Sequence, residues 1–215
     1  MSVLVDVNSK VIVQGITGRE GSFHTRQMLD YGVNIVAGVT PGKGGETVEN
    51  VPVYDTVRLA MEQHEANTVV LFVPPLRMCE AAIESIEADV PLIVTLAEGV
   101  PVHDMFLLHH MAHRHGVRLI GPNSFGIISP GKSKVGFMAH RIFVEGSVGM
   151  LSRSATNAYE TVWALSQNGI GQSTVIGVGG DMIPGSGFSE LLPLFQEDAE
   201  TKVIVLIGEI GGNDE

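Results

Sequence analysis

The chain has 215 residues, of which 44% are hydrophobic, and it carries a formal net charge of −11. This length supports one large domain or two small ones, and the acidic balance argues against non-specific binding to nucleic acid or to an anionic membrane. The single cysteine, Cys79, allows no internal disulfide, which favours a reducing compartment. No apolar run reaches about 18 residues, so the sequence predicts no membrane-spanning segment.

Short apolar runs rich in Val and Ile predict strands at 11–13, 34–39, 68–73, 91–96, 117–120, 147–151, 173–178 and 202–207. Most of these runs are continuously apolar, as is typical of strands buried on both faces of a parallel sheet. The segments between them predict helices at 21–31, 55–65, 76–87, 101–115, 156–168 and 187–197. The alternation of strands and helices predicts a doubly wound α/β fold.

The stretch 121–146 interrupts this alternation, because it has no clear helical period. We therefore expect a first unit at 1–128, a connection at 129–146 and a second unit at 147–215. The second unit offers few strands and helices, and its last turn leads into no helix, so we expect the sequence to be a piece of a longer polypeptide. A naturally short protein with a tail is the alternative.

Three glycines, Gly15, Gly18 and Gly21, follow the first predicted strand and open the first predicted helix. Glycines allow a tight turn and a close approach of the backbone to a ligand, and the N–H groups at a helix start attract anions. The alternative is simple close packing of the strand against the helix. The spacing G-x-x-G-x-x-G also differs from the dinucleotide fingerprint G-x-G-x-x-G.

The second predicted strand ends without the acid that would hold a ribose diol, and Lys43 follows it instead. A lysine suits a phosphate, so the pattern predicts a ligand that carries a pyrophosphate and a phosphorylated ribose. NADP and coenzyme A (CoA) both fit this description.

A second anion site is predicted where Ser152-Arg153-Ser154-Ala155-Thr156-Asn157 joins a strand to a helix. The start of that helix could cradle a phosphate. Ordinary helix capping by Ser154, Thr156 or Asn157 explains the same residues.

Several long motifs identify a family resemblance, in order over nearly the whole chain: QGITGREGSFH, GVTPGKGGETVENVPVYDTV, AEGVP, GPNSFGIISPG, LSRSATNAYE, GQSTVIGVGGD and VLIGEIGG. The chain resembles the α subunit of succinyl-CoA synthetase and its acyl-CoA ligase relatives. The resemblance implies an N-terminal Rossmann-like CoA-binding domain followed by a flavodoxin-like ligase domain, which is incomplete here. It favours CoA over NADP as the ligand.

The resemblance implies that CoA contacts Gly15, Thr17, Gly18, Arg19, Glu20, Gly21, Lys43, Val73, Pro74, Pro75, Leu96, Ala97 and Glu98. It implies a phosphate site at Ser154, Ala155 and Thr156, with Tyr159 and Glu209 supporting a phosphohistidine. The family usually has glycine at the position of Ala155, and Cys-Pro at Ser124-Phe125.

The family's phosphorylated histidine lies in a Gly-His-Ala-Gly motif. None of the eight histidines of this chain follows a glycine, so we expect the phosphate carrier to lie outside these residues. We expect no metal site, because His109 and His113 have no third ligand in the sequence pattern.

The leading hypothesis from the resemblance is therefore an acid–thiol ligase subunit. It would convert succinate, or a similar dicarboxylate such as malate, with CoA and a nucleoside triphosphate into acyl-CoA, nucleoside diphosphate and phosphate. The Mg-nucleotide would bind a separate β subunit, ATP or GTP being equally compatible, in a heterodimer or heterotetramer. The compartment would be the cytoplasm, or the mitochondrial matrix in a eukaryote. A non-catalytic, regulatory CoA-binding module and an NADP-linked oxidoreductase are the alternatives.

Overall fold

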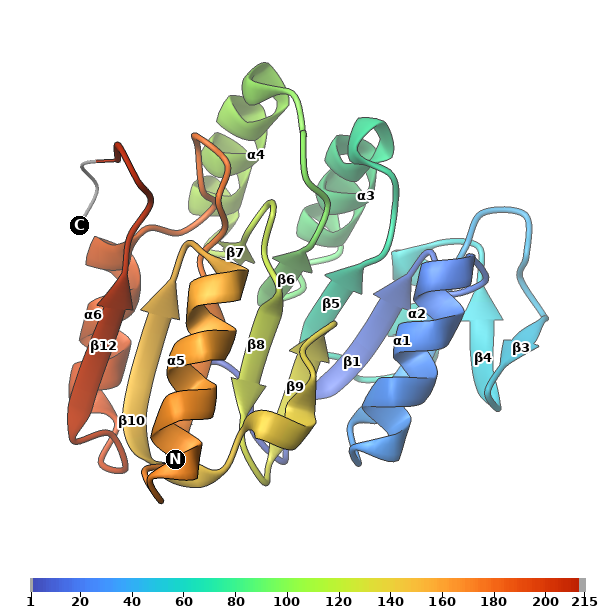
Figure 1. Cartoon of the computed structure of the whole chain (residues 1–215). Coiled ribbons are helices and arrows are strands. Elements are labelled where there is room, and N and C mark those ends of the chain that lie inside the picture. Colours follow the sequence, from blue (N-terminus) through green and yellow to red (C-terminus); the bar gives the residue numbers. More distant parts are fainter. Residues whose placement is uncertain (1, 213–215) are drawn as a thin grey trace.

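The computed structural model describes residues 2–212 and contains two β-sheets that lie side by side, each with helices on both faces (Figure 1). The first sheet consists of β1 (Lys10–Gln14), β2 (Asn34–Val39), β3 (Thr47–Val48), β4 (Val51–Tyr54), β5 (Thr68–Leu71), β6 (Leu92–Thr95) and β7 (Arg118–Ile120). Its strand order is β3-β4-β2-β1-β5-β6-β7, and all pairs are parallel except β3–β4. Without the short β3, this is the strand order of a Rossmann fold. Successive strands are added on one side of β1 up to β4 and on its other side from β5 onward, so the strand order reverses between β1 and β5.

Four helices cover the first sheet. One face carries α1 (Arg19–Asp30), and the opposite face carries α2 (Val57–Gln63), α3 (Pro75–Glu87) and α4 (Val102–His115). The strands between them are almost wholly buried, as in β5 and β6, where every residue is buried. This two-sided burial is the reason that the sequence runs there are continuously apolar.

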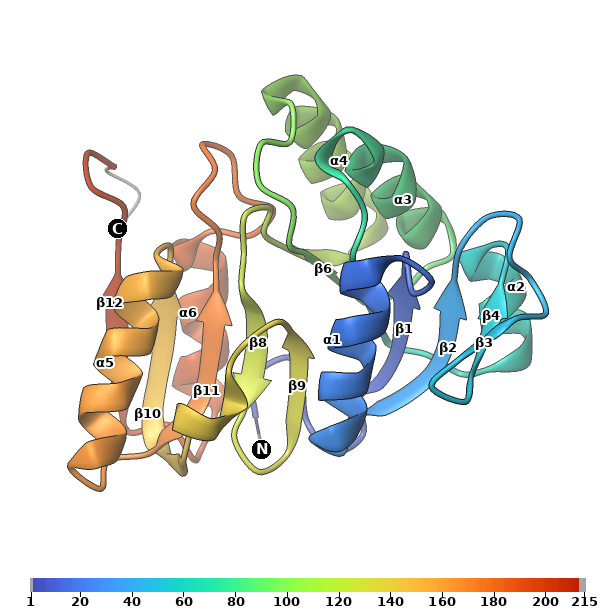
Figure 2. The same ribbon diagram turned by 45° about the vertical axis from the view of Figure 1, so that its right-hand side comes forward.

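The second sheet consists of β8 (Gly126–Ser129), β9 (Ser133–Gly136), β10 (Glu145–Ser152), β11 (Gln172–Gly177) and β12 (Val203–Ile207). Its order is β12-β10-β11-β8-β9, in which β10 pairs in parallel with β11 and β12, whereas β8 is antiparallel to β11 and β9. Helix α5 (Ala155–Gln167) lies on one face and α6 (Phe188–Glu197) on the other, and the 3-10 turn η1 (His140–Ile142) precedes β10. Turning the molecule shows β9 beside α1, at the junction of the two sheets (Figure 2).

The fold class expected from the sequence is confirmed, and each predicted strand and helix has a counterpart. The sequence patterns missed β3, β4, β8 and β9. These strands are short and lie among Pro and Gly residues, which weaken a strand signal. The organisation between the units also differs from expectation: β8 pairs with β11 of the second sheet, and β9 lies within the stretch expected to be a connection. Sheet membership therefore changes between β7 and β8.

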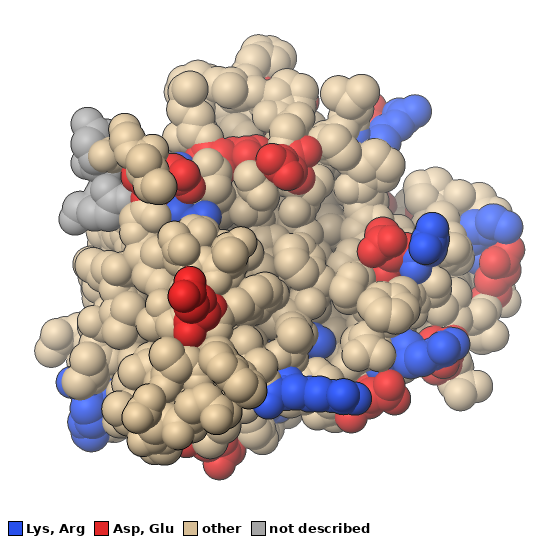
Figure 3. Space-filling model, viewed as in Figure 1, with Lys and Arg blue, Asp and Glu red and all other residues tan. Residues whose placement is uncertain are grey.

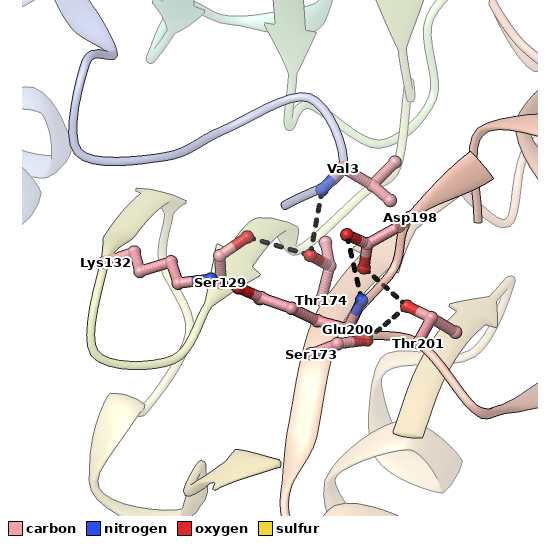
Figure 4. Close-up of polar contacts among 8 residues, drawn as sticks. All are labelled: Val3, Ser129, Lys132, Ser173, Thr174, Asp198, Glu200 and Thr201. Carbon is pink, nitrogen blue, oxygen red and sulfur yellow. Dashed lines mark hydrogen bonds and ion pairs between the residues drawn. The ribbon is translucent and has the colours of Figure 1, made fainter. Parts of the chain in front are cut away.

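The N-terminal segment crosses to the second sheet before it enters the first. Val3 is buried, and its backbone N–H donates a hydrogen bond of 3.2 Å to the Thr174 hydroxyl on β11. Ser129 of β8 shares the same hydroxyl at 2.9 Å (Figure 4). Below this contact, Lys132 forms an ion pair with Glu200. The two sheets thus share one hydrophobic core, which includes Val3.

Among residues 2–212, no helix combines the length and the apolar character needed to cross a bilayer. Over the same residues, no group of three or more His, Cys, Asp or Glu side chains is arranged to hold a metal ion.

Candidate functional site

The loop after β1 turns at Gly15 and leads to Gly18, the N-cap of α1. Gly15 has a φ of +76°, and a β-carbon there would lie 2.3 Å from the carbonyl oxygen of Phe72. A β-carbon on Gly21 would lie 2.1 Å from the carbonyl oxygen of Gly15. Both positions therefore require glycine, and the turn packs the ends of β1 and β5 against the start of α1.

A cleft of about 520 Å³ lies beside this turn, at the reversal of strand order where open α/β sheets bind ligands. We call it the glycine-turn cleft; its lining residues are Gly18, Arg19, Glu20, His24, Leu71, Phe72, Val73, Pro74, Leu96, Ala97 and Phe137. Its volume falls within the range of about 300–1,000 Å³ that is typical of small-molecule sites. The structure thus brings together residues that the resemblance implied. Val73 and Pro74 follow β5, Leu96 and Ala97 follow β6, and they meet Gly18, Arg19 and Glu20 at the turn after β1.

The other residues implied for CoA do not line this cleft. Gly15 and Gly21 shape the turn, and the Thr17 hydroxyl forms a hydrogen bond of 3.1 Å with the Thr40 hydroxyl. Pro75 is the first residue of α3, and Glu98 is exposed in the loop after β6.

Lys43 lies on the exposed loop after β2. Its ammonium group is 2.9 Å from a carboxylate oxygen of Glu46, and the two side chains are 49% and 50% exposed. An exposed pair of this kind is worth only about 0–1 kcal/mol. Lys43 can therefore exchange Glu46 for the phosphate of a ligand at little energetic cost.

The sequence motifs did not assign three aromatic residues of the cleft. The His24 ring stacks on Phe72 with a centroid distance of 5.2 Å, and it lies 6.0 Å from Phe137. Burial lowers the pKa of His24, Glu20 raises it and Lys134 lowers it further, so the net shift favours the neutral ring. His24 stands one helical turn after Glu20, a spacing that could have pointed to it. Phe137 follows a strand of the other sheet, so no local pattern could have found it.

The second predicted site lies where β10 and β12 end together. Ser152 pairs with Ile207, and the backbone N–H of Arg153 donates a hydrogen bond of 2.9 Å to the Ile207 carbonyl. Ser154 is the N-cap of α5, because its hydroxyl accepts a hydrogen bond of 3.3 Å from the Asn157 N–H. Ordinary capping is thus present, and Ser154 provides it.

Ala155 and Thr156 form the first turn of α5, next to this cap. Glu209 is exposed in the turn that follows β12. Since β10 and β12 are parallel neighbours, the structure brings the turn of Glu209 to the same sheet edge as the start of α5.

Tyr159 lies one turn into α5, where its half-buried ring packs 5.8 Å from Phe125 and 6.3 Å from Phe143. Burial raises the pKa of Tyr159 to about 12, so its hydroxyl is neutral at physiological pH. In this structure Tyr159 is an aromatic core residue of the second unit.

Arg153 is a buried arginine that the sequence patterns left without a role. Its Nε donates to the Gly179 carbonyl at 3.1 Å, and Nη2 donates to the Asp181 carbonyl at 2.6 Å. It lines a cleft of about 590 Å³, together with Phe106, His109, Val178, Met182, Ile183, Pro184, Gly187, Phe188, Ser189 and Glu190. We call this the Arg153 cleft.

A chain of hydrogen bonds connects the two clefts through Asn123. Its N–H donates to the carbonyl of Ala97 at 2.7 Å, and its side-chain amide donates to the Asp181 carboxylate at 3.0 Å. Ala97 lines the glycine-turn cleft, and Asp181 accepts from Arg153 of the other cleft. Next to Asn123, the buried Ser124 hydroxyl donates to the Gly177 carbonyl at 2.6 Å, which joins this loop to β11.

Comparison with known proteins agrees with this arrangement. Residues 6–99 match the model of the CoA-binding domain, and residues 151–215 match the CoA-ligase model. The succinate–CoA ligase [ADP-forming] subunit alpha 2 of Archaeoglobus fulgidus is 52% identical over 215 residues, which are 100% of this chain and 75% of that protein. The chain belongs to the succinate–CoA ligase α-subunit family.

Other members of this family are similarly close. The succinate–CoA ligase [ADP-forming] subunit alpha of Staphylococcus epidermidis is 48% identical over 100% of this chain and 71% of its own length. Among solved structures, ATP citrate lyase from Methanothrix soehngenii in complex with citrate and coenzyme A superposes with a TM-score of 0.87 at 26% identity. That match covers 99% of this chain and 38% of the lyase chain, so both sheets and their mutual arrangement recur there.

Proposed function

We propose that this chain is the CoA-binding α subunit of a nucleotide-dependent carboxylate–CoA ligase, an acid–thiol ligase. Its overall reaction would join succinate or a similar dicarboxylate to CoA, with conversion of a nucleoside triphosphate to the diphosphate and phosphate. The observation that carries the proposal is the glycine-turn cleft at the reversal of strand order, in a chain 52% identical to a succinate–CoA ligase α subunit. The CoA-complexed lyase of the same architecture supports CoA as the ligand.

In this proposal the first sheet binds CoA. The N–H groups at the start of α1 and the Arg19 guanidinium hold the pyrophosphate, since a helix N-terminus favours anions. Lys43 meets a further CoA phosphate. The apolar wall of Val73, Pro74 and Leu96 covers the adenosine, while the ends of β5 and β6 fix its position.

The second sheet takes part in phosphoryl transfer. Ser154, Ala155 and Thr156 present the N-terminal N–H groups of α5 to a phosphoryl group, and Glu209 orients the imidazole that carries it. We expect the phosphorylated histidine in the family's Gly-His-Ala-Gly motif, which does not occur among the 215 residues. A phosphorylated histidine divides one difficult transfer into two easier ones, and the helix start stabilises the charge between them.

Membership of the α-subunit family implies a β subunit as partner. We propose that this partner carries the Mg-nucleotide, that the two form a heterodimer or heterotetramer, and that the complex works in the cytoplasm, or in the mitochondrial matrix of a eukaryote.

The proposal is tested first by calorimetric titration of the chain with CoA and, separately, with NADPH. We expect saturable CoA binding that Arg19→Gln weakens, and no NADPH binding; tight NADPH binding without CoA binding would instead make the chain an NADP-linked protein. The second test assays the full-length gene product with its β partner for CoA-dependent nucleotide hydrolysis across a panel of carboxylic acids. CoA binding without ligase activity for any acid would make the chain a regulatory CoA-binding module.

A further inference from the structure

A second, smaller cleft adjoins the glycine-turn cleft and shares His24 and Phe137 with it. Its volume is about 260 Å³, and it lies between α1 and the stretch from β9 to η1. The polar side chains that line it are His24, Gln27, Lys134, His140 and Arg141. We call it the α1 groove. In the space-filling view, Lys and Arg side chains lie along the lower edge of this face, near α1 and η1 (Figure 3).

The most informative residue of the α1 groove is Lys134 at the centre of β9, which is only 1% exposed. Its Nζ donates a hydrogen bond of 2.9 Å to the carbonyl oxygen of Met138. An ammonium group has three N–H donors, and no carboxylate among residues 2–212 forms an ion pair with this one. Burying a charge without an anionic partner raises the free energy of the folded protein. The presence of Lys134 here therefore needs an explanation, either a ligand or a structural role.

His24 contributes a buried polar atom that has no hydrogen-bond partner among the described residues. This atom is Nδ1, whereas Nε2 lies 3.6 Å from a Glu20 carboxylate oxygen. Stacking on Phe72 holds the ring in this orientation. The α1 groove therefore contains one buried nitrogen without a hydrogen-bond partner, His24 Nδ1, and one buried ammonium group, Lys134 Nζ, whose hydrogen bond to Met138 leaves further N–H donors for a ligand.

The electrostatics of the α1 groove are those of a cation-rich space. Burial lowers the pKa of His140, Lys134 and Arg141 lower it further, and Asp30 raises it. Burial is also the largest cause that lowers the pKa of His24; Glu20 raises this pKa and Lys134 lowers it. Glu20 and Asp30 are exposed, so solvent screens their opposing charges more than that of buried Lys134.

We propose that the α1 groove binds a compact oxyanion, a phosphate or a carboxylate, between Lys134 and Arg141. The groove is smaller than sites for drug-sized ligands, which begin at about 300 Å³, so it suits a small anion. Lys134 supplies a desolvated charge, Arg141 a planar guanidinium that matches oxyanions, and Gln27 a neutral donor. This site is separate from the phosphate-binding residues proposed at α1 and α5, and it shares only the His24 and Phe137 wall with the proposed CoA cleft.

The test is calorimetric titration of the whole chain with inorganic phosphate and, in a parallel arm, with succinate. Arg141→Gln and His140→Gln are the informative variants, because both residues lie near the surface and their loss leaves the core intact. Arg114→Gln, an exposed arginine on α4, is the matched control. Lys134→Met is a third variant, interpreted only if its circular dichroism spectrum and melting curve show a folded protein.

We expect one saturable site, weakened at least about tenfold by Arg141→Gln and unchanged by Arg114→Gln, since a charged hydrogen bond is worth about 1.5–3 kcal/mol. Tighter binding of phosphate than of succinate identifies a phosphate ligand, and the reverse order identifies a carboxylate. The absence of saturable binding in both arms would overturn the proposal. So would binding that Arg19→Gln removes and Arg141→Gln leaves intact, because the anion would then occupy the glycine-turn cleft. Titration of the same variants with CoA tests the proposed function separately. Normal CoA binding without anion binding would count against the α1 groove alone, whereas loss of CoA binding would count against the proposed function.

Discussion

The side-chain amide of Asn123 lies 3.0 Å from the carboxylate of Asp181, across the junction between the loop after β7 and the loop after β11. Asn123 has a φ of +52°, a conformation that asparagine tolerates better than most residues. Its backbone N–H also donates a hydrogen bond to Ala97, which lines the glycine-turn cleft. Asn123 therefore connects that cleft to the loop of Asp181, whose carbonyl accepts a hydrogen bond from Arg153.

Asn123→Gly keeps this backbone conformation available but removes the amide. We expect the free energy of unfolding to fall by about 1–2 kcal/mol through loss of the hydrogen bond to a charged group. Asn50→Gly is the matched control, because Asn50 is exposed and has a φ of +65°. Urea denaturation measures both variants, and an equal loss in the two would show that the amide contributes nothing.

Gly21→Ala should distort the glycine turn, because its new methyl group would meet backbone rather than a movable side chain. We expect a loss of about 1–3 kcal/mol of stability and weaker CoA binding. Gly187→Ala is the control: its φ is −91° and no atom lies within 4 Å of an added β-carbon, so it should cost about 0.5 kcal/mol. Melting curves and CoA titration together test this, and unaltered CoA affinity in a folded Gly21→Ala protein would contradict the proposed site.

Lys43→Ala should weaken the binding of CoA more than that of dephospho-CoA if Lys43 meets the ribose phosphate. The expected difference is about tenfold in Kd, the value of one charged hydrogen bond. Glu46→Gln should have the opposite effect, since it removes the present partner of Lys43. Equal losses for the two ligands would place Lys43 on the pyrophosphate or away from the ligand. Lys10→Ala, which removes a distant lysine paired with Glu65, controls for net charge.

Ser154→Ala should lower the free energy of unfolding by about 1 kcal/mol, because it removes the N-cap of α5. Ser154→Asp should retain the cap, and Thr156→Ala should have little effect on stability because its side chain provides no cap. Chemical denaturation of the three variants makes the measurement. A larger loss in Thr156→Ala than in Ser154→Ala would mean that the helix starts differently.

The stability of the protein should depend on pH through Lys134. Burial lowers its pKa from 10.5 to about 8, and the unfolded chain regains the ordinary value. Between these two pH values the unfolded state binds more protons, so this residue makes the free energy of unfolding rise with pH, by about 3 kcal/mol in total.

The free energy of unfolding of Lys134→Met should not show this rise, whereas that of Lys10→Met, at a partly exposed position, should show it. Denaturation of the three proteins at pH 7.5 to 10 provides the comparison. His24 and His140 do not obscure this rise, because burial lowers the pKa of both, away from the pH range of the experiment. Parallel curves for wild type and Lys134→Met would show that the ammonium is solvated after all.

The sequence was most informative where the burial of an element follows from its own local pattern. The runs that became β1, β5 and β6 are almost entirely apolar because helices cover both faces, and the glycines at 15 and 21 are explained by backbone contacts. The short strands β8 and β9 escaped detection because β8 is buried by pairing with β11, more than 40 residues away, and β9 in turn pairs with β8.

The site residues also divide into those that a local pattern predicts and those that long-range contacts place. Arg19, Val73 and Leu96 stand at strand ends or helix starts, where position in the fold predicts a place in a cleft. Phe137 and Arg153 owe their positions to contacts between elements that are distant in the chain, whereas the helical spacing from Glu20 could have pointed to His24. Local patterns contain no information on such contacts.

The bond between Val3 and Thr174 spans 171 residues, so this segment is synthesised well before the strand that it finally contacts. At about 5–20 residues per second, translation leaves this N-terminal segment waiting roughly 10–30 seconds for its partner on β11. During that interval the side chains of Val3 and Val5, later sealed in the core, are open to chaperones and to other nascent chains. A bulky N-terminal fusion would therefore interfere with the closing step of folding, long after the first sheet has formed.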